Sequence, residues 1–541
     1  MRLLVALFGA LFLGFGSLVS CGLIEGMPGA VYFGLSAAVL GAFMIGVCRF
    51  FVEDDGAWSR YHDDAPALAA ILLAAIVVLA AALRFHALER GIWYDEMLMH
   101  VLYMNLDPLR ILVTHDNSNN HILFTFLARV SIEGFGDNVW AIRLPAVLFG
   151  VASIVAIHGF ARRVMSWPEA LVAALLLAVS YHHVWFSQNA RGYSALLFFS
   201  LLSSSYLIDA LRSGSTRNWL AYAAAAALGA LTHLTIAFLF IGHFLVFLVR
   251  ALGRETRQEH GLGPMWIGFF QGFGVLGLFM VAYYAMILPD MLGGSLIGNG
   301  LQGDSQWTNP YWAIKELFTS LQVAFSGPSV VLAGAVVMVV GMVRLALRDI
   351  APVAFFVVPV GLAILLMASI GYTLFPRFFF FAMGFALVLL VHGASALGGA
   401  LAKMLRLRGG LAAWVTVAPA LVLVLASALS VRAAYFPKQQ FQKSIDYIEE
   451  RRGADDIVAV VGISNLPYNE YHGKGWPVIT TPEELDALLD TGRRTWVIFT
   501  LPVQAMGAYP GLVDRIVERM RHETDIGGSL SGGEIVINVS G

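Results

Sequence analysis

The sequence predicts an α-helical protein that crosses a membrane about thirteen times and carries a small C-terminal α/β domain outside it. Of the 541 residues, 58% are hydrophobic and only 13% are charged, and the mean hydropathy is +0.74. The apolar residues fall into blocks of about 20, the length of a helix that spans a bilayer. A third observation is the change after residue 437, where shorter and more polar elements alternate. A water-soluble chain of this length would carry more charge on its surface.

The composition also excludes some classes of protein. The net charge of −2 and the lack of a basic surface argue against a nucleic-acid partner. The two cysteines, Cys21 and Cys48, lie in or at the ends of apolar segments and form neither a disulfide framework nor a metal cluster.

Hydropathy and loop charge predict the topology. The predicted spans are 3–22, 29–50, 66–84, 141–163, 168–186, 190–211, 218–232, 234–251, 265–288, 322–344, 350–371, 378–397 and 411–432. Arginine and lysine gather in alternate loops, as at Arg162 and Arg163 and again at Arg212 and Arg217. Because basic loops stay in the cytoplasm, the N-terminus is predicted inside and the C-terminus outside. We therefore expect a multi-pass protein of the bacterial cytoplasmic membrane.

Three domains follow from this topology. Residues 1–65 form two additional spans and a cytoplasmic loop, 66–432 form the membrane core, and 433–541 form the extracytoplasmic α/β domain. The long polar segments 85–140, 289–321 and 433–541 are all predicted outside. Within the last one we expect helices at 438–452, 481–489 and 509–522 and strands at 456–462, 494–500 and 534–539.

Two polar clusters occupy the first outer loop. The first is Gly91-Ile92-Trp93-Tyr94-Asp95-Glu96, which places two acids beside two aromatic rings just beyond a span. The aromatics could instead sit in the interface belt and the acids at a helix N-terminus. The second is Thr114-His115-Asp116-Asn117-Ser118-Asn119-Asn120-His121. It is either a turn, which Asn and Asp favour, or a site where histidines and amides bind a sugar.

Two further outer loops carry an isolated arginine. These are Ser187-Gln188-Asn189-Ala190-Arg191-Gly192-Tyr193 and Phe375-Pro376-Arg377-Phe378. Both arginines depart from the positive-inside trend. Guanidinium groups suit phosphate oxygens, so Arg191 and Arg377 could clamp a lipid phosphate. Snorkelling of long basic side chains to the membrane surface is the alternative.

Taken in order, these motifs resemble a known family. Trp93-Tyr94-Asp95-Glu96, Asn119-Asn120-His121, Arg143-Leu144-Pro145, the loop at Arg191 and Pro376-Arg377-Phe378 are similar to those of the GT-C superfamily of glycosyltransferases. The similarity is to the bacterial branch related to protein O-mannosyltransferases and to the lipid A aminoarabinose transferase, and it covers roughly residues 66–400. The resemblance implies a GT-C-like core, a polyprenyl-phosphate sugar donor and inverting transfer to a glycan, lipid or protein acceptor.

The resemblance also assigns roles to residues. Asp95 matches the family's catalytic acid and would act as general base, with Glu96 as its helper or substitute. Arg377 and Arg191 would bind the departing phosphate. Contacts to sugar or acceptor are expected from His115, Asp116, Asn120, His121, Gln188 and Tyr193. No metal site is predicted, although some members of the superfamily use a divalent cation, and the two acids with Asp116 could hold one.

The chain departs from the family pattern at several positions. Ile122 follows the histidine where the family often has proline, Asn189 stands where glutamate is usual, and Phe378 replaces a common tyrosine. These differences put the acceptor in doubt. Three other functions compete: a lipid or sugar transporter or flippase, a non-catalytic scaffold, and an oligosaccharyltransferase that moves a preassembled glycan. A transporter would show ionisable residues within several spans and internal repeats, and the sequence shows neither.

Overall fold

The chain folds into two compact units. The computed structural model describes residues 67–117, 119–252, 262–293, 310–325, 328–369, 372 and 374–541. The first unit comprises the described parts of Met1–His86, Leu112–Phe124 and Pro145–Val431. The second comprises Ala87–Ile111, Thr125–Leu144 and Arg432–Gly541. The whole predicted segment 1–65, with its spans 3–22 and 29–50, and residues 294–309 of the predicted outer segment lie outside the described residues.

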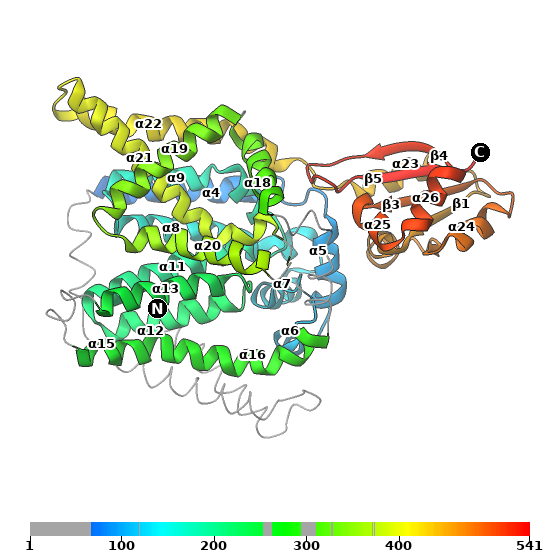
Figure 1. Cartoon of the computed structure of the whole chain (residues 1–541). Coiled ribbons are helices and arrows are strands. Elements are labelled where there is room, and N and C mark those ends of the chain that lie inside the picture. Colours follow the sequence, from blue (N-terminus) through cyan, green and yellow to red (C-terminus); the bar gives the residue numbers. More distant parts are fainter. Residues whose placement is uncertain are drawn as a thin grey trace. The chain divides into compact units, whose positions relative to one another are not determined.

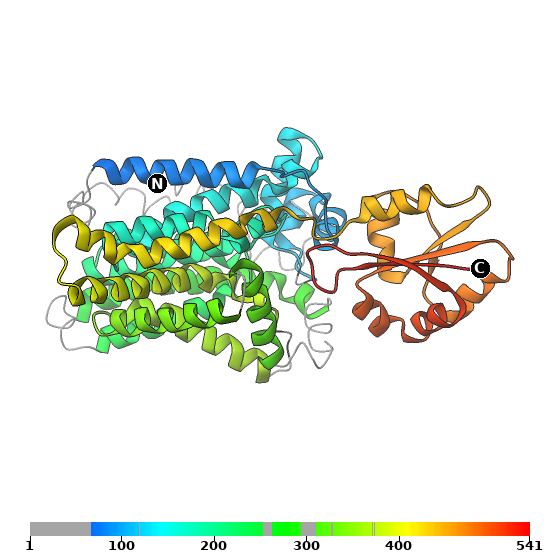
Figure 2. The same cartoon turned by 90° about the horizontal axis from the view of Figure 1, so that it is seen from above.

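Helices that run alongside one another build the first unit (Figures 1 and 2). In chain order they are α4 (Ala67–Phe85), α8 (Val139–Arg162), α9 (Trp167–Ala178), α10 (Tyr181–Ser187), α11 (Tyr193–Ser213), α12 (Thr216–Ala230), α13 (Ile236–Leu252), α15 (Leu262–Phe269), η2 (Phe270–Gly274), α16 (Val275–Gly293), α18 (Pro310–Phe325), α19 (Pro328–Ala346), α20 (Ala351–Ser369), η3 (Pro376–Ala382), α21 (Met383–Met404) and α22 (Gly409–Ser430). The first residues of α8 belong to the second unit.

The helices have the length and apolar surface of membrane spans. Over the described ranges, eight helices are long and apolar enough to cross a bilayer, or nine if the bent pair α9 and α10 counts as one span. Large apolar side chains such as Ile71, Val78 and Leu365 are exposed on them, as expected of residues that face lipid rather than water. The prediction of a polytopic helical membrane protein is confirmed, while the number of thirteen spans stays a prediction.

Two glycines bring α19 and α21 into close contact. A Cβ atom on Gly341 would overlap the carbonyl oxygen of Leu389, and one on Gly393 would overlap that of Val337. Small residues at a helix crossing let backbones approach, which is how helices gain packing energy where lipid removes the hydrophobic driving force. The helix α21 therefore packs tightly between α19 and α22.

A buried arginine supports the break between α9 and α10. The sequence predicts one span at 168–186, but the two helices meet at 58°. The fully buried guanidinium of Arg84 donates to the carbonyls of Ala178 at 3.2 Å and Leu177 at 3.4 Å, and it also contacts Nδ1 of His183 at 2.6 Å. These carbonyls belong to the last turn of α9, and that of Leu177 also accepts from the backbone N–H of Ser180 at 3.3 Å. In a membrane such groups need an internal partner.

The second unit contains a five-stranded mixed sheet. Its strand order is β2-β1-β3-β5-β4, with β1 (Ile457–Val461) parallel to β2 (Val478–Ile479) and to β3 (Thr495–Thr500). The strand β5 (Ile535–Val539) is antiparallel to β3 and to β4 (Arg521–Ile526). The helices of this part are α23 (Phe441–Glu449), η5 (Gly462–Ser464), η6 (Leu466–Tyr471), α24 (Pro482–Leu489), α25 (Pro502–Ala508) and α26 (Pro510–Arg519).

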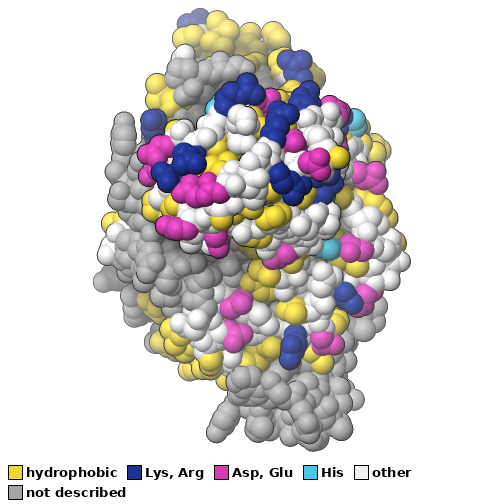
Figure 3. Space-filling model, turned by 90° about the vertical axis from the view of Figure 1, so that its right-hand side faces the viewer, with side chains coloured by type: hydrophobic (Ala, Val, Ile, Leu, Met, Phe, Trp, Pro, Cys, Tyr) yellow, Lys and Arg dark blue, Asp and Glu magenta, His cyan; other side chains and the backbone are white. Residues whose placement is uncertain are grey.

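Most predicted elements of this α/β domain are present. The exception lies at 509–522, where the predicted helix ends at Arg519 and β4 begins at Arg521. The sequence reasoning missed β4 because Arg521-His522-Glu523-Thr524-Asp525-Ile526 has almost no apolar alternation. As an edge strand it pairs only with β5, so most of its side chains can remain polar and exposed. Figure 3 shows acidic and basic side chains interspersed on the surface that faces the viewer.

Segments of the first outer loop complete the second unit. They are α5 (Tyr94–Met99), the π-helix η1 (His100–Met104), the start of α6 (Pro108–Val113) and most of α7 (Ile122–Phe135). The backbone N–H of Tyr94 donates to Oε1 of Gln439 at 2.9 Å, and its hydroxyl donates to the carbonyl of Ile463 at 3.3 Å. Gln439 in turn donates to Thr500 on β3. The acidic segment is thus hydrogen-bonded to the C-terminal domain.

We expect Arg84→Met to destabilise the protein. The change leaves the carbonyl of Ala178 without its side-chain donor, and an unmet buried group costs about 1–3 kcal/mol. Thermal unfolding of the detergent-purified protein should therefore begin at a lower temperature than in the wild type. Lys403→Met, at an exposed position near the end of α21, is the control. Equal unfolding temperatures for the two variants would contradict the assigned role.

Candidate functional site

The two adjacent acids of the first cluster lie in different environments. Asp95 and Glu96 occupy the first turn of α5, where negative charge is stabilised by the helix dipole. Asp95 is partly exposed, whereas Glu96 is completely buried. The pKa of Tyr94 is raised, first by burial and then by the charge of Asp95. The Tyr94 phenol therefore stays protonated and serves as a hydrogen-bond donor.

Glu96 is held by a bidentate ion pair with Arg143. The Nη2 and Nε atoms of Arg143 approach the two carboxylate oxygens at 2.6 and 2.8 Å. The same guanidinium donates to the carbonyls of Leu88 and Arg90 at 2.7 Å and of Gly91 at 2.8 Å. One buried group thereby fixes the backbone that leads into α5. The sequence pointed to Arg143 as part of a motif but gave no indication of this partner, because the two residues are far apart in the chain.

A second site forms in the first unit around His121 and Arg191. Nη1 of Arg191 donates to Oδ1 of Asn119 at 2.9 Å, and its Nη2 lies 3.2 Å from Nε2 of His121. The backbone N–H of Gly192 donates to Nδ1 of the same histidine at 2.8 Å. A neutral imidazole that accepts at Nδ1 carries its proton on Nε2. The Nε2–H group of His121 and the guanidinium of Arg191 are then two neighbouring donors, an arrangement that suits a shared anionic acceptor.

Aromatic and basic residues from four segments surround this pair. The ring of His121 meets those of Tyr193 and His233 edge-on, with centroids 5.1 and 4.9 Å apart. His233 also packs against Phe378 at 5.6 Å. We call the group His115, His121, Arg191, Tyr193, His233, Arg377 and Phe378 the basic cluster. His233 was missed as a site residue: the sequence showed only that Thr232-His233 interrupts an apolar stretch.

Both predicted arginines lower the pKa of the same two histidines. The pKa of His121 is well below its usual range, because of burial first and then Arg191, with smaller effects of His233, His115 and Arg377. Burial, followed by Arg191, Arg377 and His115, lowers the pKa of His233 to about 3. Burial also lowers the pKa of His115 to about 4, against the opposing charge of Asp116. These rings are therefore neutral near pH 7.

Two buried side chains of the basic cluster have unsatisfied polar atoms. Within the part of the chain that the structure describes, both ring nitrogens of His115 and the hydroxyl of Tyr193 are enclosed without a hydrogen-bond partner. His115 is 5% exposed and Tyr193 is 1% exposed. Most buried polar side chains are hydrogen-bonded, so such atoms point to a ligand that completes them. The cluster is thus equipped to bind a polar, anionic group.

Other predicted site residues have different surroundings. Asn120 donates to the carbonyl of Thr114 at 2.7 Å and closes the turn. Gln188 donates to the carbonyls of Arg84 at 2.9 Å and His86 at 2.6 Å, at the C-terminal end of α4. Asp116 is exposed beside His115. Asp95 and Glu96 belong to the second unit and the basic cluster to the first. Across the described segments, no three acidic, histidine or cysteine residues are arranged to hold a metal ion.

Comparison with known proteins supports the predicted resemblance. Residues 119–288 match the model of the dolichyl-phosphate-mannose-protein mannosyltransferase family, and this range contains His121, Arg143, Arg191 and His233. No curated protein matches the sequence.

Among solved structures, the chain is similar to ArnT from Cupriavidus metallidurans bound to undecaprenyl phosphate, with 13% identity and a TM-score of 0.47 over 86% of this chain and 97% of that one. It is also similar to the oligosaccharyltransferase of Archaeoglobus fulgidus, with 12% identity and a TM-score of 0.49 over 87% of this chain and 73% of that one.

We expect Arg143→Met to destabilise the second unit strongly. It leaves the fully buried Glu96 carboxylate unpaired, a change that typically costs about 3–5 kcal/mol. The double variant Glu96→Leu/Arg143→Met should recover part of that loss, because no buried charge remains. Thermal unfolding in detergent measures both. The control is Arg129→Met, which removes a surface ion pair with Glu133 worth about 0.5 kcal/mol and one hydrogen bond to the carbonyl of Met104. A small effect of Arg143→Met, like that of the control, would contradict this role.

Proposed function

We propose that this chain, a GT-C glycosyltransferase related over residues 119–288 to the dolichyl-phosphate-mannose-protein mannosyltransferases, transfers a sugar from a polyprenyl-phosphate donor to an extracytoplasmic glycan, lipid or protein. The basic cluster is the main support for this proposal, because hydrogen-bond donors of buried side chains lie there together with two arginines. The matched family is named for dolichyl-phosphate-mannose, which is a sugar carried on a prenyl phosphate. The guanidinium groups of the basic cluster suit the oxygens of such a phosphate.

The proposed donor site uses the cluster as an anion cradle. Arg191 and the Nε2–H of His121 would donate to one phosphate oxygen, and Arg377 would add a second positive charge. His115 and Tyr193, whose polar atoms are enclosed without partners, would bind hydroxyls of the sugar. Arg377 also stacks on Phe375, with its guanidinium carbon 4.5 Å from the ring centre. This stacking restricts the rotamers of the side chain before the donor binds.

The proposed reaction is a single inverting displacement. The acceptor oxygen attacks the anomeric carbon and forms the new glycosidic bond as the bond from that carbon to the phosphate oxygen breaks. The phosphate leaves with the electron pair, and the hydroxyl proton of the acceptor passes to Asp95 as general base. Glu96 is engaged by Arg143, so we assign it to positioning Asp95 rather than to proton transfer.

The remaining predicted residues are proposed as positioning residues. Asn120 and Gln188 donate to backbone carbonyls near the cluster, so they would hold the loops rather than contact the sugar. Asp116 lies at the exposed edge and would face the acceptor. A divalent cation is not needed for this step, because phosphate is already a good leaving group when two arginines bind it.

We propose that the basic cluster and the C-terminal domain face the extracytoplasmic side, with the N-terminus in the cytoplasm. At the far end of α11 from Arg191, Arg212 and Arg250 both pair with Asp349, and Arg163 pairs with Asp209. A helix of 21 residues is about 30 Å long, enough to separate the two ends by a bilayer core. The positive-inside rule assigns the end with these arginines to the cytoplasm.

We expect Asp95→Asn to abolish transfer with little change in yield or unfolding temperature. Loss of a general base typically lowers the rate by about 10²–10⁴-fold. The measurement is transfer of label from a panel of radiolabelled undecaprenyl-phosphate sugars to membrane acceptors in vesicles. Asp290→Asn, at an exposed position of α16, should leave transfer intact. Unchanged transfer by Asp95→Asn would reassign the base, and no transfer by the wild type with any sugar would favour a transporter.

We expect Arg377→Ala to weaken binding of the lipid phosphate itself. Loss of a charge-assisted contact to phosphate, worth about 1.5–3 kcal/mol, should raise the dissociation constant by at least about tenfold. Undecaprenyl phosphate without a sugar is the probe, titrated into the detergent-purified protein. Arg344→Ala removes an arginine near the opposite end of the spans and should leave the affinity unchanged. Equal affinities of the two variants would refute a phosphate role for Arg377.

A further inference from the structure

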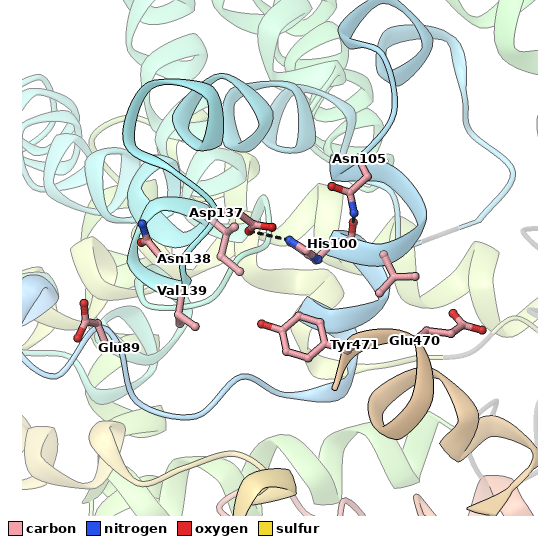
Figure 4. Close-up of a pocket in the computed structure, with 10 residues that line it drawn as sticks. Glu89, His100, Asn105, Asp137, Asn138, Val139, Glu470 and Tyr471 are labelled. Atoms are coloured by element: carbon pink, nitrogen blue, oxygen red, sulfur yellow. Dashed lines mark hydrogen bonds and ion pairs between the residues drawn. The ribbon is translucent and has the colours of Figure 1, made fainter. Parts of the chain in front are cut away.

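Two π-helices meet at a cavity in the second unit. The first, η1, begins at His100, and the second, η6, ends at Tyr471. The cavity between them has a volume of about 620 Å³ (Figure 4). Well under 1% of residues in proteins adopt a π-helix, and these turns occur frequently at functional sites. Their occurrence on both sides of one cavity suggests that it binds a ligand.

The cavity is acidic. Its lining residues are Glu89, His100, Val101, Asn105, Asp137, Asn138, Val139, Ile142, Glu470 and Tyr471. They include three carboxylates and neither lysine nor arginine. Figure 4 shows His100 and Asp137 beside Tyr471, with Glu89 and Glu470 on opposite flanks. After burial, the charges of Glu96 and Asp137 raise the pKa of the Tyr471 phenol, although Arg143 opposes them. The cavity therefore favours a cation.

His100 contacts both an acidic and an aromatic residue of the cavity lining. Its Nε2 lies 2.8 Å from Oδ1 of Asp137, and its ring meets that of Tyr471 edge-on at 5.5 Å. The other ring nitrogen, Nδ1, is enclosed and has no hydrogen-bond partner within the described ranges. With Nε2 donating to Asp137, Nδ1 of the neutral ring is an acceptor. It can take a hydrogen bond from an N–H or O–H group of a ligand.

These features together suit an amino sugar. Carboxylates attract a protonated amine, and the face of a tyrosine also attracts an ammonium group. The side-chain N–H of Asn105 donates to the carbonyl of His100, and its amide oxygen can accept from a hydroxyl of the sugar. The volume lies within the usual range for small-molecule sites, about 300–1,000 Å³. A lysine side chain would use the carboxylates but would bring no hydroxyl to the amide oxygen of Asn105.

The cavity is also linked to the proposed base. The helix α5 continues directly into η1, so Asp95 and His100 lie five residues apart on one continuous helix, roughly 7.5 Å along its axis. The charge of Glu470 reaches Tyr94, the neighbour of Asp95, where it contributes to the raised pKa. A glycan bound in the cavity would thus bring nearby hydroxyls close to Asp95.

We propose that this cavity is the acceptor site and that it recognises an acceptor glycan through a protonated amino sugar. The assignment of the ligand as an acceptor rests on the proposed transfer reaction, whereas the binding of an amino sugar does not. The carboxylates of Glu89 and Glu470 attract the amine, Tyr471 stacks on it or on the sugar ring, and Nδ1 of His100 accepts a hydrogen bond from the ligand.

The test compares two oligosaccharides that differ only in charge. The full-length protein in detergent is titrated with a β-1,4-linked glucosamine tetramer and with its fully N-acetylated counterpart, and calorimetry gives both affinities. We expect the charged tetramer to bind at least tenfold more tightly, with an advantage that shrinks at high salt. Equal affinities would overturn the proposal. So would equally tight binding of tetralysine, because the site would then select charge and not a sugar.

Variants place the binding in the cavity. Glu89→Gln/Glu470→Gln removes two exposed carboxylates of the lining and should lower the affinity for the glucosamine tetramer at least tenfold. Glu133→Gln, an exposed acid of the same unit outside the cavity, should leave it unchanged. The same affinity in both variants would refute the site.

Asp95→Asn separates the two proposals. It should bind the tetramer like the wild type while it fails to transfer sugar. If the wild-type protein binds the tetramer but transfers no sugar, the cavity remains an amino-sugar site and the proposed transfer reaction is wrong. Transfer that persists in Glu89→Gln/Glu470→Gln at the wild-type rate, across acceptor concentrations, would refute the acceptor assignment and leave the transferase intact.

Discussion

The buried ion pair between Arg143 and Glu96 is the constraint on which the acidic segment depends. Arg143 uses its donors on one carboxylate and three carbonyls, so the backbone from Leu88 to Gly91 has little freedom. That backbone leads into α5 and sets the direction in which the helix starts. A general base acts only when it lies within hydrogen-bond reach of its proton. The fixed entry to α5 therefore limits where the carboxylate of Asp95 can be, and the same helix continues into the cavity at His100.

Polar side chains next to the breaks of the helices serve the backbone first. Arg84 donates to carbonyls at the end of α9, Gln188 donates to carbonyls at the end of α4, and Asn120 closes its own turn. A membrane gives free carbonyls no water to bond, so irregular backbone there requires side-chain donors. Motif residues of this kind are needed even if they never contact a substrate. A loss of activity in their variants would have to be separated from a loss of folded protein.

The sequence predicted the fold class and most elements of the α/β domain, because hydropathy and local periodicity determine both. The stretch Thr481-Pro482-Glu483-Glu484 has the form of a capping box, which correctly predicts the start of α24, since Thr481 accepts from the backbone N–H of Glu484. Local patterns gave no sign of β4, whose polar side chains are tolerated at a sheet edge. Nor could they show that Glu96 pairs with Arg143 or that His233 joins His121. These contacts join residues distant in the chain, and only tertiary structure brings them together.

The positive charge of the basic cluster would attract a departing phosphate more strongly than it would attract the phosphate of the intact donor. Burial and the two arginines keep His121 and His233 neutral, so the fixed positive charge comes mainly from Arg191 and Arg377. A polyprenyl-phosphate sugar is a phosphodiester with a single negative charge, whereas the departing monoester carries about −1.5 to −2 near pH 7. In the proposed reaction, the two guanidinium groups would therefore gain attraction as the bond to the sugar breaks. Interactions that strengthen in this way accelerate the reaction, because they stabilise the transition state more than the ground state.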